Sequence, residues 1–169
     1  MIAGADLAMR TVDPGDFIPF LGGRLRQLFV QDSGDLLQRL THLDETRDPD
    51  GRFRINEFFC HDNTWRQTLK ALLGRSDLVL MDLRGFSESN SGCLFELQQL
   101  AENGLLQRTM FVIDDRTDVP LLESTLTRHA RQIGALGKDA SLPSLNLSRS
   151  ETQSATDLDR IYSSLCALA

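Results

Sequence analysis

The chain has 169 residues, of which 41% are hydrophobic and 25% charged, an ordinary composition for a folded protein with a substantial core. A formal net charge of −6 argues against general attraction to nucleic acids or anionic lipids, and no apolar run approaches the roughly 20 residues of a membrane helix. The three cysteines are widely spaced and form no zinc motif, so we expect reduced thiols in a cytoplasmic protein.

Residues 1–24 show no clear periodicity and are interrupted by proline and glycine, which predicts an irregular lead-in to a single domain over 25–169. A short strand is expected over Leu25–Val30. Asp32 or Ser33 then caps a helix, because leucines recur behind these residues at helical spacing.

The segment from residue 52 to residue 74 predicts a strand followed by a helix. "RFRINEFF" alternates apolar and polar side chains, which is typical of a strand over 53–59. Asp62 or Asn63 is the expected N-cap of the helix, which carries Trp65 on its apolar face and stops at Gly74.

The next segment predicts two buried strands with a helix between them. "DLVLMDL" (77–83) and "TMFVID" (109–114) are continuous apolar runs, typical of central strands buried on both faces. The helix within "SESNSGCLFELQQLAENG" (87–104) should end at Asn103-Gly104, a favourable left-handed C-cap, with Gln99 on its polar side.

Two further helices and a weaker strand complete the chain. Pro120 sits in the first turn of a helix, and "LPSLNLS" (142–148) predicts a strand. Ser154 or Thr156 opens the last helix, with Tyr162 on its apolar side.

Strands that alternate with helices of 10–15 residues indicate βαβ units and a mostly parallel sheet covered on both faces. We therefore predict an α/β fold: a flavodoxin-like (Rossmann-like) three-layer sandwich with a sheet of four to five strands.

Ligands of open α/β sheets bind outside the carboxyl ends of the strands, so polar residues that follow the predicted strands are site candidates. The dinucleotide motif GxGxxG and the phosphate-binding GxxxxGK[ST] are absent from the sequence, and no cofactor is expected. Asp114, Asp115 and Asp118 could hold a divalent ion, but acidic loops after strands are common, and we predict no metal site. The polar residues that follow the strands are Cys60, His61, Asp62, Asn63, Asp82, Arg84, Ser87, Ser89, Asn90, Asp114, Asp115, Arg116 and Asp118.

Glu96 lies at the edge of the apolar stripe of its helix, where it is neither fully exposed nor fully buried. Side chains on a helix tilt towards its N-terminus, which is the ligand-binding side of the sheet. The helix dipole favours a negative charge there. Two interpretations stay open, because the same position also suits a glutamate without any functional role.

The segment "SDLVLMDLRGFSESNSGCLFEL" resembles the strand, loop and helix of nucleoside 2-deoxyribosyltransferases, whose pattern is like D-S-G-T-x-x-E. It is also similar to the corresponding segment of TIR domains. Both families have flavodoxin-like folds and include enzymes that cleave N-glycosidic bonds with a glutamate. The close similarity covers residues 76–114, and Cys93 stands where the transferases usually have a threonine.

The resemblance implies that Glu96 is a catalytic carboxylate that cleaves the N-glycosidic bond of NAD or a related nucleotide. It further implies a substrate-binding loop next to the sugar. Trp65 is a candidate for stacking on a base, although the first apolar residue of a helix more often belongs to the core. The alternative is a non-catalytic TIR-like signalling module that self-associates or binds partner TIR-like domains; a receiver-like or flavin-binding domain is a weaker third reading. The expected substrate-binding residues are Asp82, Arg84, Ser87, Asn90, Gly92 and Trp65.

Overall fold

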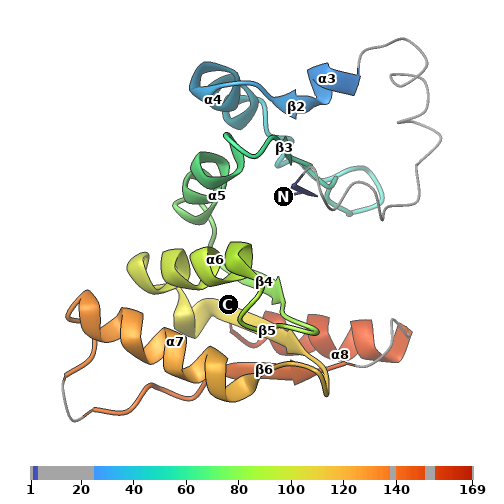
Figure 1. The fold of residues 1–169 in the computed structure, drawn as a ribbon. Helices are drawn as coiled ribbons and strands as arrows, with labels where there is room; N and C mark the ends of the chain where they lie inside the picture. Colours follow the sequence, from blue (N-terminus) through green and yellow to red (C-terminus); the bar gives the residue numbers. More distant parts are fainter. Residues whose placement is uncertain (1, 4–24, 138–139, 151–154, 169) are drawn as a thin grey trace. The chain divides into compact units, whose positions relative to one another are not determined.

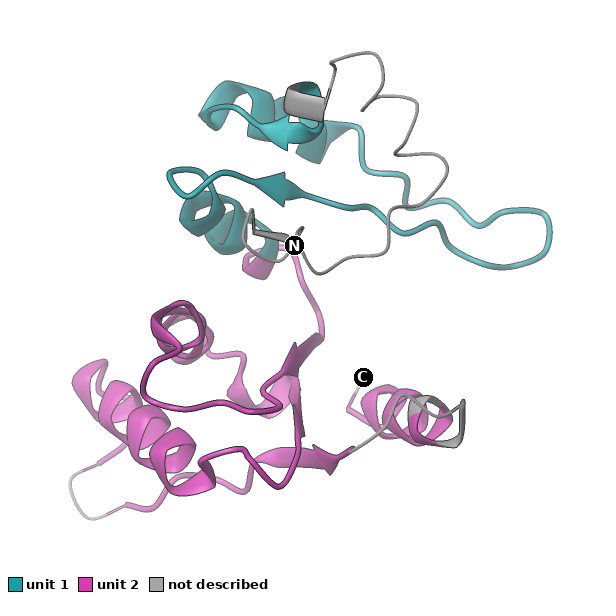
Figure 2. Cartoon of the chain, turned by 45° about the vertical axis from the view of Figure 1, so that its right-hand side comes forward, with its two compact units in different colours: residues 1–72 teal, residues 73–169 magenta. Residues whose placement is uncertain are grey.

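The computed structural model describes residues 2–3, 25–137, 140–150 and 155–168 (Figure 1). The chain divides into two compact units, 1–72 and 73–169 (Figure 2), and each contains a three-stranded parallel sheet with helices. The α/β class is therefore confirmed. The prediction of a single domain over 25–169 stays a prediction. Every helix in the described ranges is too short or too polar to span a lipid bilayer.

The sheet of residues 1–72 has the order β1-β3-β2. Its central strand β3 (Phe59–Cys60) pairs in parallel with β1 (Ile2–Ala3) and with β2 (Phe29–Val30). The prediction for the lead-in did not include β1, and the rest of the lead-in, residues 4–24, lies outside the described residues.

Two helices pack against this sheet around one apolar cluster. α4 (Ser33–Thr41) connects β2 to β3 in the chain, and α5 (Trp65–Leu73) follows β3. Asp32 caps α4 as predicted, since its Oδ1 accepts from the backbone N–H groups of Gly34 at 2.8 Å and Asp35 at 2.9 Å. The buried members of the cluster are Val30, Leu36, Leu40, Phe58 and Cys60.

The sequence predicted longer strands here than the structure has. Residues Leu25–Leu28 form the helix α3, so the predicted strand starts only at Phe29. In the predicted strand 53–59 only Phe59 is part of a ladder, while Phe53 makes an isolated antiparallel bridge with Arg47. The alternating pattern predicted a half-buried strand, but Ile55 is 87% exposed and does not face a core, so the apolar side chains of this segment form no buried face.

The sheet of residues 73–169 has the order β4-β5-β6, with β4 (Val79–Asp82), β5 (Thr109–Ile113) and β6 (Asn146–Arg149) all parallel. α6 (Ser91–Glu102) and α7 (Val119–Gln132) lie on one side of this sheet and α8 (Ala155–Cys166) on the other (Figures 1 and 2). This unit therefore has the three layers typical of doubly wound α/β proteins.

The helix ends in this unit follow the sequence signals. Gly104 has φ +68°, and α6 ends in a Schellman motif in which the Leu105 N–H donates to the Leu100 carbonyl oxygen at 3.0 Å. Asp118 caps α7 by accepting from the Leu121 N–H at 2.9 Å, and Pro120 lies in the first turn as predicted. Between α6 and β5 the chain forms a 3-10 turn (Leu106–Arg108).

Several burial predictions were wrong in this unit. All five residues of β5 are buried as predicted, but β4 is an edge strand of its sheet and its Leu80 is 52% exposed. Gln99 was placed on the polar side of α6 and is buried, with its Nε2 donating to Glu102 Oε2 at 2.7 Å. Tyr162 was placed in the core and is exposed.

The predicted sheet of four to five strands is larger than either sheet that the structure shows. Among the described residues each unit has one sheet of three strands, and in residues 1–72 each strand contributes two residues to the ladder. The helix N-cap predicted at Asp62 or Asn63 was also wrong, because α5 starts at Trp65 and Thr64 closes the preceding turn.

We predict that Leu122→Ala, at a fully buried position of α7, lowers the free energy of unfolding by about 2–5 kcal/mol, because it removes apolar contacts and leaves a cavity. Leu37→Ala makes the same change at an exposed position of α4 and should cost less than about 0.5 kcal/mol. Urea denaturation followed by circular dichroism measures both. Equal losses for the two variants would contradict the described core.

Candidate functional site

The first part of the candidate site is the end of β4, where Asp82 binds Arg84. The backbone N–H of Arg84 donates to Asp82 Oδ1 at 3.1 Å, and its Nε lies 2.9 Å from the same oxygen. Nη2 donates to Asp82 Oδ2. These hydrogen bonds from the Arg84 guanidinium lower the pKa of Asp82, so the carboxylate is ionised at neutral pH.

The second part is the end of β5, where the buried carboxylate of Asp114 accepts from several donors. The N–H groups of Gly85 and Arg116 lie 2.8 and 3.1 Å from Oδ1, and the Arg116 Nε lies 3.0 Å from Oδ2. The Gly85 N–H, followed by the side chains of Arg116 and Thr117, holds the pKa of Asp114 well below its usual range, although burial opposes this. Asp114 is therefore a firmly ionised, structural carboxylate.

Asp114 ties the loop after β4 to the loop after β5. The hydroxyl of Thr117 accepts from the Asp114 N–H and lies 2.9 Å from both Asp114 Oδ1 and the Leu83 carbonyl oxygen, to one of which it donates. The Asp118 N–H donates to the Phe86 carbonyl oxygen at 2.9 Å, and the Phe86 side chain is buried. The two loops therefore form one fixed polar surface at the carboxyl edge of the sheet.

Ser87 and Asn90 form a compact turn just before α6. Asn90 Oδ1 accepts from the Ser87 N–H at 2.9 Å and from the Ser87 hydroxyl at 3.0 Å, while Ser87 Oγ lies 2.9 Å from Ser89 Oγ. Asn90 is the N-cap residue of α6, but its side chain makes no capping hydrogen bond to the helix. The predicted site residues Ser87 and Asn90 thus contact each other.

Glu96 lies on α6 and is half-buried, as its position at the edge of the apolar stripe predicted. Gly92 lies in the first turn of the same helix, and a Cβ built on it would meet no other atom within 4 Å. Glu96 and the predicted residues Asp82, Arg84, Ser87, Asn90 and Gly92 therefore all belong to one segment of the same compact unit.

The remaining predicted site residues belong to residues 1–72. Trp65 packs against the apolar cluster of that unit, which agrees with the core interpretation, and the Arg66 guanidinium lies 5.3 Å from its ring centroid. His61 stacks on Phe29 with ring centroids 4.6 Å apart, and burial raises the pKa of the Cys60 thiol. A role for Trp65 in stacking on a base stays a prediction.

The three aspartates considered for a metal ion have separate structural partners. Asp114 holds the two loops together, Asp115 forms an ion pair with Arg149, and Asp118 caps α7. Within the described ranges, no group of three or more His, Cys, Asp or Glu side chains is arranged to hold a metal ion.

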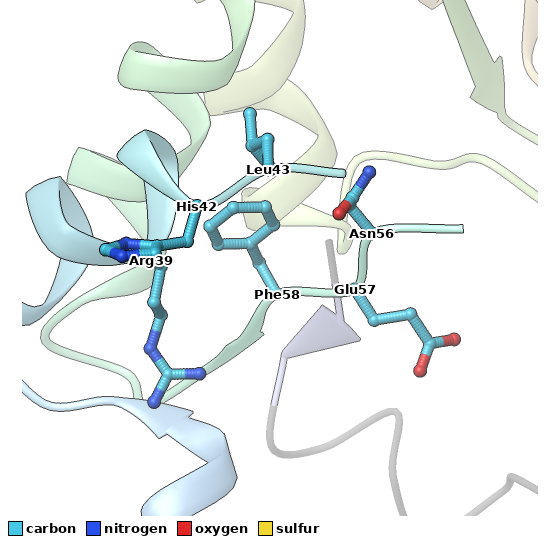
Figure 3. A pocket seen from close by; sticks show the side chains of 6 residues that line it. All are labelled: Arg39, His42, Leu43, Asn56, Glu57 and Phe58. Atoms are coloured by element: carbon cyan, nitrogen blue, oxygen red, sulfur yellow. The ribbon is translucent and has the colours of Figure 1, made fainter. Parts of the chain in front are cut away.

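A cavity of about 190 Å³ opens in residues 1–72, and none of the predicted site residues lines it (Figure 3). Its polar side chains serve the local structure: the Arg39 Nη1 donates to the Leu28 carbonyl oxygen at 3.0 Å, and Asn56 bonds both backbone groups of Asp44. The cavity is smaller than the roughly 300–1,000 Å³ of typical ligand pockets. It is lined by Arg39, His42, Leu43, Asn56, Glu57 and Phe58.

Sequence reasoning placed Gly85 and Arg116 among the residues that follow the strands but assigned neither of them a specific role. Gly85 adopts φ +71°, a conformation that favours glycine, and its N–H reaches a carboxylate 29 residues away. Arg116 pairs with Asp114 by the same Asp-x-Arg spacing that joins Asp82 and Arg84. The repeated spacing after two successive strands was the signal that could have identified Arg116.

Comparisons with protein-family models, with curated proteins and with solved structures gave no match to this chain.

We predict that Asp114→Asn destabilises the protein at pH 6 to 7 and that this difference narrows as the pH falls below about 4, the ordinary range of an aspartate. A carboxylate whose pKa is lower in the folded state stabilises the fold above its unfolded pKa, and protonation removes this contribution. Asp159→Asn, at an exposed position of α8, is the matched control. Urea denaturation at pH 7, 4 and 3 measures the effect, and a difference that is constant over this range would contradict it.

Proposed function

We propose that residues 76–114 form the site of a TIR-like or deoxyribosyltransferase-like N-glycosidase that acts on NAD or a related nucleotide, with Glu96 as its catalytic carboxylate. The observation that carries this proposal is the position of Glu96. It is half-buried on the helix that follows β4, behind a loop of polar side chains at the carboxyl edge of a parallel sheet. Ligands of α/β proteins bind at this edge.

Cleavage of the N-glycosidic bond requires mainly a negatively charged side chain close to C1′ of the sugar. The bond between C1′ and the base nitrogen breaks, and its electron pair leaves with the base. The oxocarbenium-like sugar is then stabilised, or attacked, by a carboxylate before water adds to C1′ and loses a proton. Glu96 is the proposed carboxylate because the resemblance places the catalytic glutamate at this position of the helix, whereas Asp82 and Asp114 have structural roles in the loops after β4 and β5.

Further parts of the proposal concern the substrate and the fold. Asp82, Arg84, Ser87, Asn90 and Gly92 would contact the sugar and the phosphates of the substrate. We also propose a flavodoxin-like fold, since β4-β5-β6 follow the chain order of the last three strands of that fold. We also propose that the protein is cytoplasmic, where the thiols of Cys60, Cys93 and Cys166, which form no disulfide here, would stay reduced.

A non-catalytic TIR-like interaction module is the second candidate, and one observation favours it. The polar side chains of the loop bind one another: Asp82 binds Arg84, and Ser87 binds Asn90. Such a loop is rigid, and a rigid polar surface is equally suited to docking another protein domain. Under this interpretation Glu96 has no chemical role.

We predict that Glu96→Gln abolishes release of nicotinamide from NAD, with a loss of at least about a hundredfold, because the amide cannot stabilise a positive C1′ centre. Liquid chromatography of the full-length chain incubated with NAD, and separately with nucleosides, measures the released base.

Glu123→Gln is the matched control, since Glu123 is an exposed residue of α7 in the same unit. This variant should release base at the rate of the wild type. Equal release by both variants would contradict the role of Glu96. If the wild type releases no base from any of these substrates, the interaction module is the better proposal.

A further inference from the structure

The loops after β4 and β5 contain two turns of the same kind. In each, an arginine N–H donates to the aspartate two residues before it, at 3.1 Å in both the Asp82-Arg84 and the Asp114-Arg116 turn. The arginine Nε donates to the same carboxylate. Because β4 and β5 are parallel neighbours, both turns lie at the carboxyl edge of the sheet.

The two turns differ in which charge faces solvent. The side chain of Arg116 is 80% exposed and that of Asp114 8%, whereas the values are 27% for Arg84 and 53% for Asp82. In the Asp82-Arg84 turn the carboxylate is therefore the group that is more accessible to an ion in solution. In the Asp114-Arg116 turn the guanidinium is the accessible group, because backbone and hydroxyl donors enclose the carboxylate.

The Arg116 guanidinium is held on one edge and open on the other. Its Nε and Nη2 bind Asp114 Oδ2 at 3.0 and 2.9 Å, while its Nη1 has no hydrogen-bond partner in the part of the chain that is described. Its Cζ and Nη2 lie 4.0 Å from the position that a Cβ of Gly85 would take. An arginine fixed in this way loses little conformational entropy when its remaining donors bind an anion.

The surrounding charges balance and do not by themselves attract anions. Asp82 is paired with Arg84, and Asp115 is paired with Arg149. Binding of an anion at Arg116 would therefore depend on directed hydrogen bonds from a fixed guanidinium, for which phosphate oxygens are well matched acceptors.

We propose that the open edge of Arg116 binds a phosphate group of the ligand, so that this site recognises a phosphorylated nucleotide and not a free nucleoside. The inference rests on the proposed function, because it names the substrate class of that site. It depends on binding alone and does not require that Glu96 cleaves the ligand.

Isothermal titration calorimetry of the full-length chain at low salt tests the proposal, with ADP, pyrophosphate and adenosine as probes. We expect ADP and pyrophosphate to bind and adenosine to bind at least about tenfold more weakly than ADP, since it lacks the charged acceptors. Arg116→Gln should weaken ADP binding by about tenfold or more. Arg128→Gln, which removes the same charge from an exposed position of α7, should leave it unchanged.

Asp114→Asn separates a fixed guanidinium from simple charge attraction. The variant removes one negative charge next to Arg116, and with it the carboxylate that holds the guanidinium. Weaker ADP binding by this variant supports the proposal. Stronger ADP binding would overturn it, because the affinity would then depend on the net charge of the site and not on the fixed orientation of the Arg116 guanidinium.

The remaining outcomes separate this inference from the proposed function. Absence of ADP and pyrophosphate binding, or equal binding by Arg116→Gln and Arg128→Gln, overturns the inference whatever the base-release assay shows. ADP binding that Glu96→Gln retains and Arg116→Gln loses supports it, even if the wild type releases no base from NAD.

Discussion

One buried carboxylate, that of Asp114, determines the shape of the candidate site. It takes hydrogen bonds from the N–H of Gly85, which follows β4, and from the N–H and Nε of Arg116, which follows β5. A buried charge is costly unless it is paired and fully hydrogen-bonded, so the structure around it must supply these donors. The conformation of both loops follows from this requirement: Gly85 needs its positive φ to direct its N–H at the carboxylate, and Thr117 bridges to the loop after β4.

The start of α6 depends on the same interaction. Between Gly85 and the helix the chain contains the buried ring of Phe86, which fixes it on the apolar side, and the turn of Ser87 and Asn90. These residues leave little freedom for the first turn of α6. The half-buried position of Glu96 follows from its place at the edge of the apolar stripe of its own helix.

Sequence patterns predicted those features that depend on local physics. The all-buried strand β5, the cap at Asp32, the Pro120 turn and the Gly104 C-cap each follow from a few neighbouring residues. Features that need distant partners were missed. A strand over 53–59 needs a partner strand along its whole length, and only Phe59 pairs with one. The role of Arg116 depends on the carboxylate of Asp114, which in turn is bound by Gly85, 29 residues away.

The ionisation of the two strand-end aspartates bears on which glycosidic bond the site could cleave. Hydrogen bonds lower the pKa of both Asp82 and Asp114, so neither carries a proton to donate at neutral pH. The purine base of a nucleoside is a poor leaving group unless an acid protonates it, and both aspartates lack a proton to donate. Nicotinamide leaves NAD as a neutral molecule from a positively charged pyridinium and needs no acid. Among N-glycosidic substrates, the charge state of these loops therefore favours one that already carries a positive charge on its base, and a single carboxylate such as Glu96 would suffice.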